Sequence, residues 1–157
     1  MPNVFTDRLP ILMYHRVAPT GSASTARYRV TPETFGEQLH CLRNAGYYSI
    51  NLDDWFFAME RKMPLPGKAV VLTFDDGYLD FKTYAWQLIR QYGFLATVFL
   101  VTDKIGESNS WDSVYGEELP LLGWDDIRNL QDEGVDFGSH TASHPYLTTD
   151  VHPGKNT

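Results

Sequence analysis

The sequence has 157 residues, enough for one domain with a substantial core but short of the roughly 250 that a complete eight-stranded α/β barrel needs. Hydrophobic residues make up 43% of the chain and charged residues 21%, which is typical of a globular protein and excludes a disordered or fibrous one. The formal net charge of -7 argues against nucleic acid as a partner and suits neutral or cationic ligands.

Cysteine content and the start of the chain bear on its environment. Cys41 is the only cysteine, so no disulfide within the chain is expected, and its place beside Leu42 in a predicted helix indicates a packed thiol. The first twenty residues carry charges and prolines and hold no apolar stretch long enough for a signal peptide or a membrane span. We therefore expect no membrane span and, for the chain as given, a cytoplasmic location.

Short apolar runs alternate with helical patterns along the chain. The run AVVLTF at 69–74 is continuously apolar and rich in β-branched residues, as in a strand buried on both faces of a parallel sheet. Thr31 and Pro32 favour the start of a helix, because Thr is a preferred N-cap and Pro fits the first helical position. In chain order we predict a strand over 10–14, a helix from Thr31 to Gly46, a strand over 47–50, a helix capped by Asn51 or Asp53, a strand over 69–74, a helix over 78–92, a strand over 95–101, a helix over 124–133 and a strand over 135–137.

This order of elements predicts the fold class. Strands that alternate with helices favour a right-handed parallel α/β arrangement, here with about five strands. The connection over 102–123 is longer than usual, and its composition fits either an insertion or a functional loop. In parallel α/β folds functional residues gather at the carboxyl ends of the strands, so a site is expected there.

Two strand ends carry side chains of the kind that bind metals. The segment Thr73–Gly77 (TFDDG) places two adjacent carboxylates after a buried strand; such residues are common in turns, but their mutual repulsion favours a bound cation or a shared proton. The segment Ser139–Pro145 (SHTASHP) holds two histidines four residues apart, which would lie on one face if the segment were helical. One aspartate with two histidines is the mixed ligand set of a catalytic zinc or similar divalent site.

These two motifs, in this order, resemble the polysaccharide deacetylase family that shares the NodB homology domain, a carbohydrate esterase type. The likeness runs from about Leu9 to Thr148, and the segment ILMYHRV at 11–17 is closest to deacetylases of poly-β-1,6-N-acetylglucosamine. The resemblance implies a single domain over 1–157 that forms an incomplete deformed (β/α) barrel, with parallel strands inside and helices outside. It also implies a carbohydrate substrate with N-acetylated amino sugars and hydrolysis of its linear amide bonds.

The family pattern, carried over position by position, implies a role for four residues. Asp75 would be the general base, and Asp76, His140 and His144 would hold a divalent metal, with zinc as the first choice and cobalt or another divalent ion as alternatives. On this division Asp76→Ala should lose the metal, whereas Asp75→Ala should keep it.

The sequence departs from the family after Asp150. The Arg-containing segment, the later aromatic strand and the late His that protonates the leaving amine are absent, and general acid catalysis typically contributes about 10² to 10⁴ in rate. We therefore expect weak or no deacetylation by this chain alone. His152 fits a frayed tail better than a replacement acid. His15, at a strand end, fits a hydrogen-bonded structural residue or a support for the site.

Aromatic residues near the long connection have two readings. Trp111, Trp124 and Tyr115 could stack on sugar rings if the loop overhangs the site, although most aromatic side chains in such a domain belong to the core.

Two other functions remain open at this point. A noncatalytic metal-binding or glycan-binding remnant of a deacetylase would also explain the motifs without the late acid. A phosphatase with an aspartate nucleophile fits less well, because Asp75 and Asp76 are adjacent and the two histidines of the second motif would have no role. An incomplete barrel also leaves strand edges unpaired, which predicts self-association through an open sheet edge or a chain shortened from a longer protein.

Overall fold

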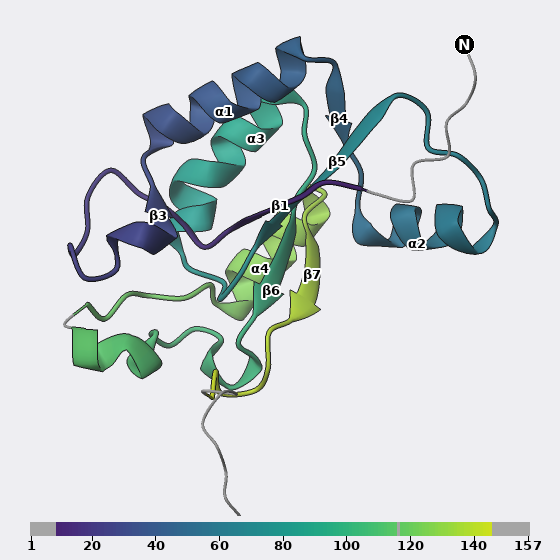
Figure 1. The fold of residues 1–157 in the computed structure, drawn as a ribbon. Helices are drawn as coiled ribbons and strands as arrows, with labels where there is room; N and C mark the ends of the chain where they lie inside the picture. The colour runs from purple at the N-terminus through teal and green to yellow at the C-terminus, as the bar shows by residue number, and fades with distance from the viewer. Residues whose placement is uncertain (1–8, 116, 146–157) are drawn as a thin grey trace, which may run out of the picture.

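The structure is a computed structural model that describes residues 9–115 and 117–145 (Figure 1). Its centre is β5 (Lys68–Phe74), the apolar run predicted to be a buried strand. β5 pairs in parallel with β1 (Ile11–Tyr14), β4 (Tyr47–Ser49) and β6 (Thr97–Leu100), and β6 pairs in parallel with β7 (Asp136–Ser139). The predicted parallel α/β fold is thus confirmed, with five strands in the main sheet.

Four α-helices accompany the sheet, and local capping explains where they begin. α1 (Pro32–Asn44) starts after Thr31, whose hydroxyl accepts a hydrogen bond from the Thr34 N–H at 3.2 Å. α2 (Leu52–Glu60) starts after Asn51, whose side-chain oxygen accepts from the Asp54 N–H at 2.7 Å. α3 (Trp86–Tyr92) and α4 (Trp124–Asp132) complete the set.

The predicted helix over 78–92 is only partly correct. Tyr78 forms a bridge and Leu79 a turn, a wider π-helical stretch follows after Asp80 as η2 (Phe81–Ala85), and the regular helix α3 begins only after it. Wider turns of this kind are frequent beside functional sites. Short elements that periodicity does not reveal are β2 (Arg16–Val17), which pairs with β3 (Arg29–Val30), and the 3₁₀ helices η1 (Ala26–Tyr28), η3 (Thr102–Lys104) and η4 (Ser110–Tyr115).

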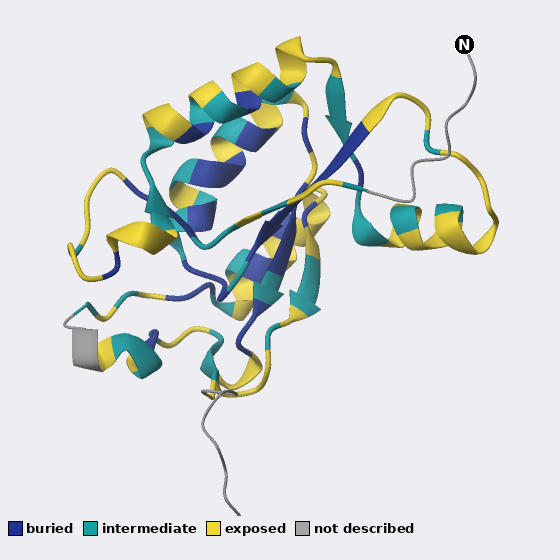
Figure 2. Cartoon of the chain, in the orientation of Figure 1, coloured by how far each residue is buried: buried dark blue, intermediate teal, exposed yellow. Residues whose placement is uncertain are grey.

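The core lies between the sheet and three of the helices. One face of β5 and β6, including Phe74 and Val98, packs in one buried cluster with side chains of α1, α3 and α4. In Figure 2 the strand β5 is dark blue at the centre of the molecule, and the helices around it carry yellow, exposed outer faces. In a second, smaller cluster of buried side chains, Val71 of β5 packs with Trp55 of α2. Other aromatic residues of α2, such as Phe56, are exposed.

The sheet is not closed into a barrel within the described residues, as expected for an incomplete barrel. β1 has β5 as its strand partner and forms one edge, where Ile11 is 47% exposed and Met13 is 61% exposed. Cys41 of α1 is exposed, so the expectation of a packed thiol is wrong: with Met13 of β1 it lines an open groove beside this edge. No helix among the described residues is long and apolar enough to cross a membrane.

Candidate metal and catalytic site

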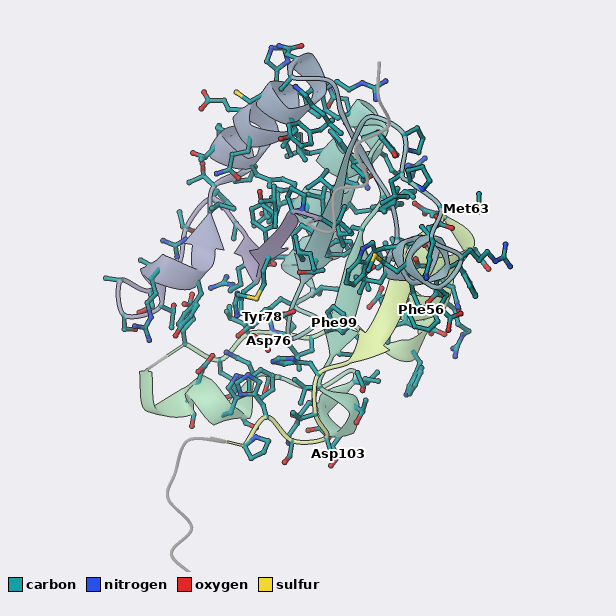
Figure 3. The ribbon with its side chains drawn as sticks, turned by 45° about the vertical axis from the view of Figure 1, so that its right-hand side comes forward. Phe56, Met63, Asp76, Tyr78, Phe99 and Asp103 are labelled. Atoms are coloured by element: carbon teal, nitrogen blue, oxygen red, sulfur yellow. The ribbon has the colours of Figure 1, made fainter. Side chains whose placement is uncertain are left out.

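The carboxyl ends of β5 and β7 bring the two sequence motifs together. Asp75 and Asp76 follow β5 directly, and His140 follows β7, two strands away in the sheet. The Asp75 N–H extends the strand pairing by donating to the Tyr14 carbonyl of β1 at 2.9 Å. Figure 3 shows Asp76 and Tyr78 at this end of the molecule, far from Phe56 and Met63 around α2.

A left-handed backbone aims the Asp76 side chain into the site. Asp76 has φ 74° and Gly77 has φ 75°, a region that Asp tolerates and Gly adopts freely. The space beside Gly77 is also restricted, because a Cβ there would lie 2.7 Å from Cδ2 of Leu100. The second Asp of the motif is therefore buried, 4% exposed, while Asp75 is only partly buried.

The second motif forms a tight turn, so the helical arrangement considered from its spacing is wrong. Thr141 and His144 have φ 62° and 55°, values that an α-helix excludes. The Thr141 hydroxyl accepts a hydrogen bond from the His144 N–H at 3.0 Å, and the His140 N–H donates to the Leu100 carbonyl at 2.7 Å. The turn still brings the two imidazole rings together, with centroids 5.3 Å apart.

Three side chains converge as a ligand set. Oδ1 of Asp76 lies 3.5 Å from Nε2 of His140 and 3.3 Å from Nε2 of His144. Two ligands bound at about 2.1 Å with tetrahedral geometry would be about 3.4 Å apart, so these separations fit a zinc-sized cation better than direct hydrogen bonds. The three ligand atoms all lie within 4.8 Å of one another.

The electrostatics of Asp76 also fit a cation. Its Oδ1 is buried and accepts no hydrogen bond from the residues that the structure describes. Burial raises the pKa of Asp76 to about 7, His140 acts against this shift, and the charge of Asp75 adds to it. A buried carboxylate without a donor is unfavourable, and a divalent cation held by these three side chains would remove the penalty.

Asp75 lies beside this trio without belonging to it. Its charge raises the pKa of Asp76 and also acts on His15, which places its carboxylate near both. An unligated carboxylate next to a cation site has the position required of a general base.

A pocket of about 190 Å³ opens beside the ligand trio. His15 lines it and packs against Tyr28, with ring centroids 5.2 Å apart. Burial lowers the pKa of His15, whereas the Asp75 charge raises it. His15 follows β1, at a strand end that was expected to face the site, and it does line the pocket. Its lining includes His15, Tyr28, Asp76, Trp111, Asp112 and His144.

The long connection over 102–123 is a wall of the site. It is fixed to the first motif where the Leu122 N–H donates to the Gly77 carbonyl at 2.8 Å, and Leu121 forms an isolated bridge with Tyr78. Its Trp111 ring stacks on His144, with centroids 4.7 Å apart and planes 17° apart. Among the aromatic candidates, Trp111 therefore reaches the site.

The other candidates from the sequence do not add to this arrangement. Trp124 is 59% exposed at the start of α4 and does not line the pocket. The Tyr115 side chain and His152 lie outside the part of the molecule that the structure describes.

Comparison with known proteins agrees with the motifs. Residues 62–155 match the family model described as polysaccharide deacetylase. The chain is 30% identical over 115 residues to the poly-beta-1,6-N-acetyl-D-glucosamine N-deacetylase of Escherichia coli strain K12, covering 70% of this chain and 17% of that protein. It is 28% identical over 142 residues to the enzyme of the same name from Staphylococcus epidermidis, covering 83% of this chain and 47% of the relative.

Solved structures give the same picture. The deacetylase PplD of Streptococcus pyogenes, in complex with acetate, has a TM-score of 0.70 and 29% identity over 87% of this chain and 57% of its own. IcaB from Ammonifex degensii has a TM-score of 0.72 and 26% identity over 87% of this chain and 54% of its own. The chain thus spans about half the length of these structural relatives.

Proposed function

Because the chain belongs to the polysaccharide deacetylase family, we propose that it hydrolyses the N-acetyl groups of an amino-sugar polymer or oligosaccharide. The observation that carries the proposal is the convergence of Asp76, His140 and His144, with the free carboxylate of Asp75 beside them. The names of the two curated relatives support a substrate with N-acetylglucosamine units. The net charge of -7 is compatible with a neutral or partly cationic sugar chain.

Asp76, His140 and His144 would hold a divalent cation, for which zinc is the first candidate and cobalt the second. The mixed oxygen and nitrogen ligands and the short separations between them support this assignment. Such a cation, when bound, would polarise the acetyl carbonyl and make a nearby water molecule more acidic.

The remaining steps belong to residues of the chain. Asp75 would accept the proton of the attacking water as the new carbon–oxygen bond forms. The carbon–nitrogen bond then breaks, and the leaving amine needs a proton. His15 lines the pocket and does not belong to the ligand trio; burial lowers the pKa of this imidazole, and the charge of Asp75 acts against that shift. In this scheme His15 donates that proton and acetate leaves.

His15 also bears on the expectation of weak turnover. That expectation rests on the family resemblance alone. The expectation of weak turnover remains a prediction. If His15 acts as the acid, His15→Gln should lower kcat by about 10² or more and leave zinc affinity unchanged. Equal turnover by the variant and the unchanged protein would exclude His15 from proton transfer.

The decisive experiment compares two neighbouring carboxylates. Asp76→Ala should abolish zinc binding measured by calorimetry, because it removes a ligand, whereas Asp75→Ala should retain zinc and lose turnover. Turnover is measured by mass spectrometry as the loss of acetyl groups from N-acetylglucosamine oligomers, with saturating zinc or cobalt. Zinc binding without turnover at high protein concentration would overturn the enzymatic proposal and favour a noncatalytic metal-binding or glycan-binding protein.

A further inference from the structure

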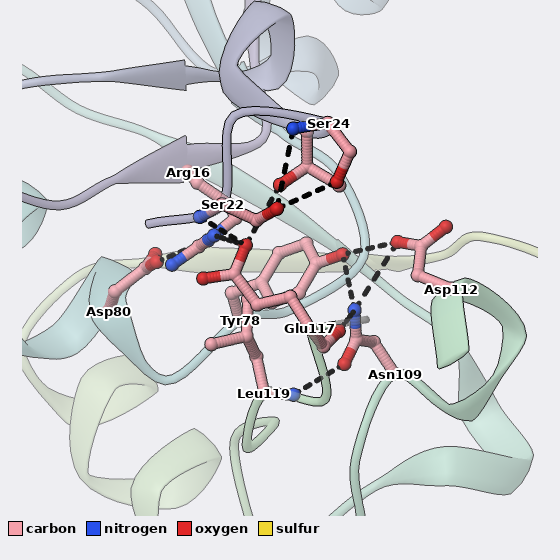
Figure 4. Close-up of polar contacts among 10 residues, drawn as sticks. Arg16, Ser22, Ser24, Tyr78, Asp80, Asn109, Asp112, Glu117 and Leu119 are labelled. Atoms are coloured by element: carbon pink, nitrogen blue, oxygen red, sulfur yellow. Dashed lines mark hydrogen bonds and ion pairs between the residues drawn. The ribbon is translucent and has the colours of Figure 1, made fainter. Parts of the chain in front are cut away.

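Arg16 and Glu117, which line the pocket, form an ion cluster with Asp80 that joins three separate segments (Figure 4). Arg16, which follows His15, is 5% exposed. Its Nε lies 2.9 Å from Oδ2 of Asp80, and its Nη1 lies 3.2 Å from Oε2 of Glu117. The cluster therefore connects β2, the start of η2 after the first motif and the long segment 102–123.

Glu117 is the member of this cluster that reaches a fourth segment. The oxygen that binds Arg16 also accepts hydrogen bonds from the Ser22 N–H at 3.0 Å and the Thr25 hydroxyl at 2.8 Å. Burial tends to raise the pKa of Glu117, but these two hydrogen bonds and the Arg16 charge outweigh it and leave the pKa below its usual value. One carboxylate oxygen of Glu117 thus connects segment 20–28 to segment 102–123.

The wall itself is held from its other side. The Asn109 side chain, 1% exposed, donates to the Tyr78 hydroxyl, to Asp112 Oδ2 and to the Glu117 carbonyl, each at 3.3 Å. The Tyr78 hydroxyl donates to Asp112 Oδ2 at 3.2 Å. Because Tyr78 directly follows the TFDDG motif, these bonds hold segment 102–123 against that motif. Glu117 then joins segment 102–123 to segment 20–28.

Both joined segments line the pocket. Thr25 and Tyr28 line it from segment 20–28, and Trp111 and Asp112 line it from segment 102–123. We propose that Glu117 is a positioning residue that shapes the substrate pocket by fastening these two segments together. The inference rests on the proposed function only for the nature of the ligand, an N-acetylated sugar. Glu117 contacts none of the three metal ligands in the interactions described, so its effect is expected on substrate binding.

The test compares Glu117→Ala and Glu117→Gln with Glu118→Gln, a control that removes the same charge at the next, exposed position. Hydrogen exchange of the apoprotein is measured for peptides covering 20–28 and, as a folding control, β5. Loss of Glu117 should speed exchange over 20–28 by about tenfold or more, because hydrogen bonds to a charged group are lost, and leave β5 unchanged. Glu117→Gln should show a smaller effect, since its amide oxygen still accepts.

The functional arm measures KM, kcat and zinc affinity on N-acetylglucosamine oligomers. Glu117→Ala should raise KM by about tenfold while kcat changes less than threefold and zinc affinity is unchanged. Unchanged exchange over 20–28, or faster exchange with an unchanged KM, would overturn the inference. If the protein turns over no oligomer, the proposed function fails, but the exchange result and calorimetric binding of the oligomer to each variant still decide whether Glu117 shapes the pocket.

Discussion

Gly77 links the two motifs of the site, and replacing it tests how they are held together. Its φ is 75°, which disfavours any other residue, and a Cβ at this position would lie 2.7 Å from Cδ2 of Leu100. Leu100 in turn accepts the hydrogen bond of the His140 N–H at 2.7 Å. Gly77→Ala should therefore destabilise the protein and also disturb a metal ligand on another strand.

The expected loss of unfolding free energy in Gly77→Ala has two parts, and another glycine of the chain provides a control for one of them. The left-handed backbone costs an alanine about 1–2 kcal/mol. The contact with Leu100 adds about 1–3 kcal/mol, the usual range for overpacking a core, so the total is about 2–5 kcal/mol. Gly93 has φ 67° with nothing within 4 Å of its Cβ position, so Gly93→Ala should show only the backbone part, about 1–2 kcal/mol.

The assay is urea unfolding of both variants, followed by zinc calorimetry. Gly77→Ala should lose more unfolding free energy than Gly93→Ala and should bind zinc more weakly, while Gly93→Ala keeps its zinc affinity. The double variant Gly77→Ala with Leu100→Ala should recover zinc affinity, because the clashing atom is gone. Equal stability losses for the two glycines, or full zinc affinity in Gly77→Ala, would refute the reasoning.

Three further predictions concern pH and the sheet edge. Zinc affinity should fall as pH drops below about 7, because burial raises the pKa of Asp76 to about 7 and bound metal must displace its proton. Calorimetry showing equal affinity at pH 5 and 8 would contradict the ligand set. Burial likewise raises the pKa of Asp80 to about 6, although Arg16 acts against this shift. The contribution of Asp80 to the unfolding free energy is therefore present below its unfolded pKa and is lost as pH rises from about 4 to about 6. Asp80→Asn should make the unfolding free energy from urea melts less dependent on pH in that window, and an unchanged slope would contradict this. Any self-association of the chain through β1 should weaken in Ile11→Lys, as light scattering would show, whereas a protein that is monomeric at all concentrations would rule out this mode of assembly.

Most of the fold could be predicted from local patterns. The run at 69–74 has no polar alternation, so burial on both faces and a parallel sheet followed directly. Thr31 and Asn51 marked helix starts correctly, because caps are local interactions. The π-helical η2 and the short pair of β2 and β3 could not be predicted, since they depend on packing between segments far apart in the sequence.

The functional site could likewise be predicted from the sequence only in part. The convergence of Asp76 with His140 and His144 followed from strand ends and from the family resemblance, even though the expected helix is a turn. Trp111 and Glu117 acquire their positions through contacts with residues far away in the chain, which no spacing in the sequence reveals.

The order of strands in the sheet has a consequence for variation within the family. The ligands come from the ends of β5 and β7, with β6 between them, and the exposed edge is β1 on the other side of β5. Three neighbouring strands are therefore enough to hold the ligand trio. Relatives can differ in how they continue the sheet beyond β1 without moving a ligand, whereas a strand inserted between β5 and β7 would separate the ligands and abolish the site.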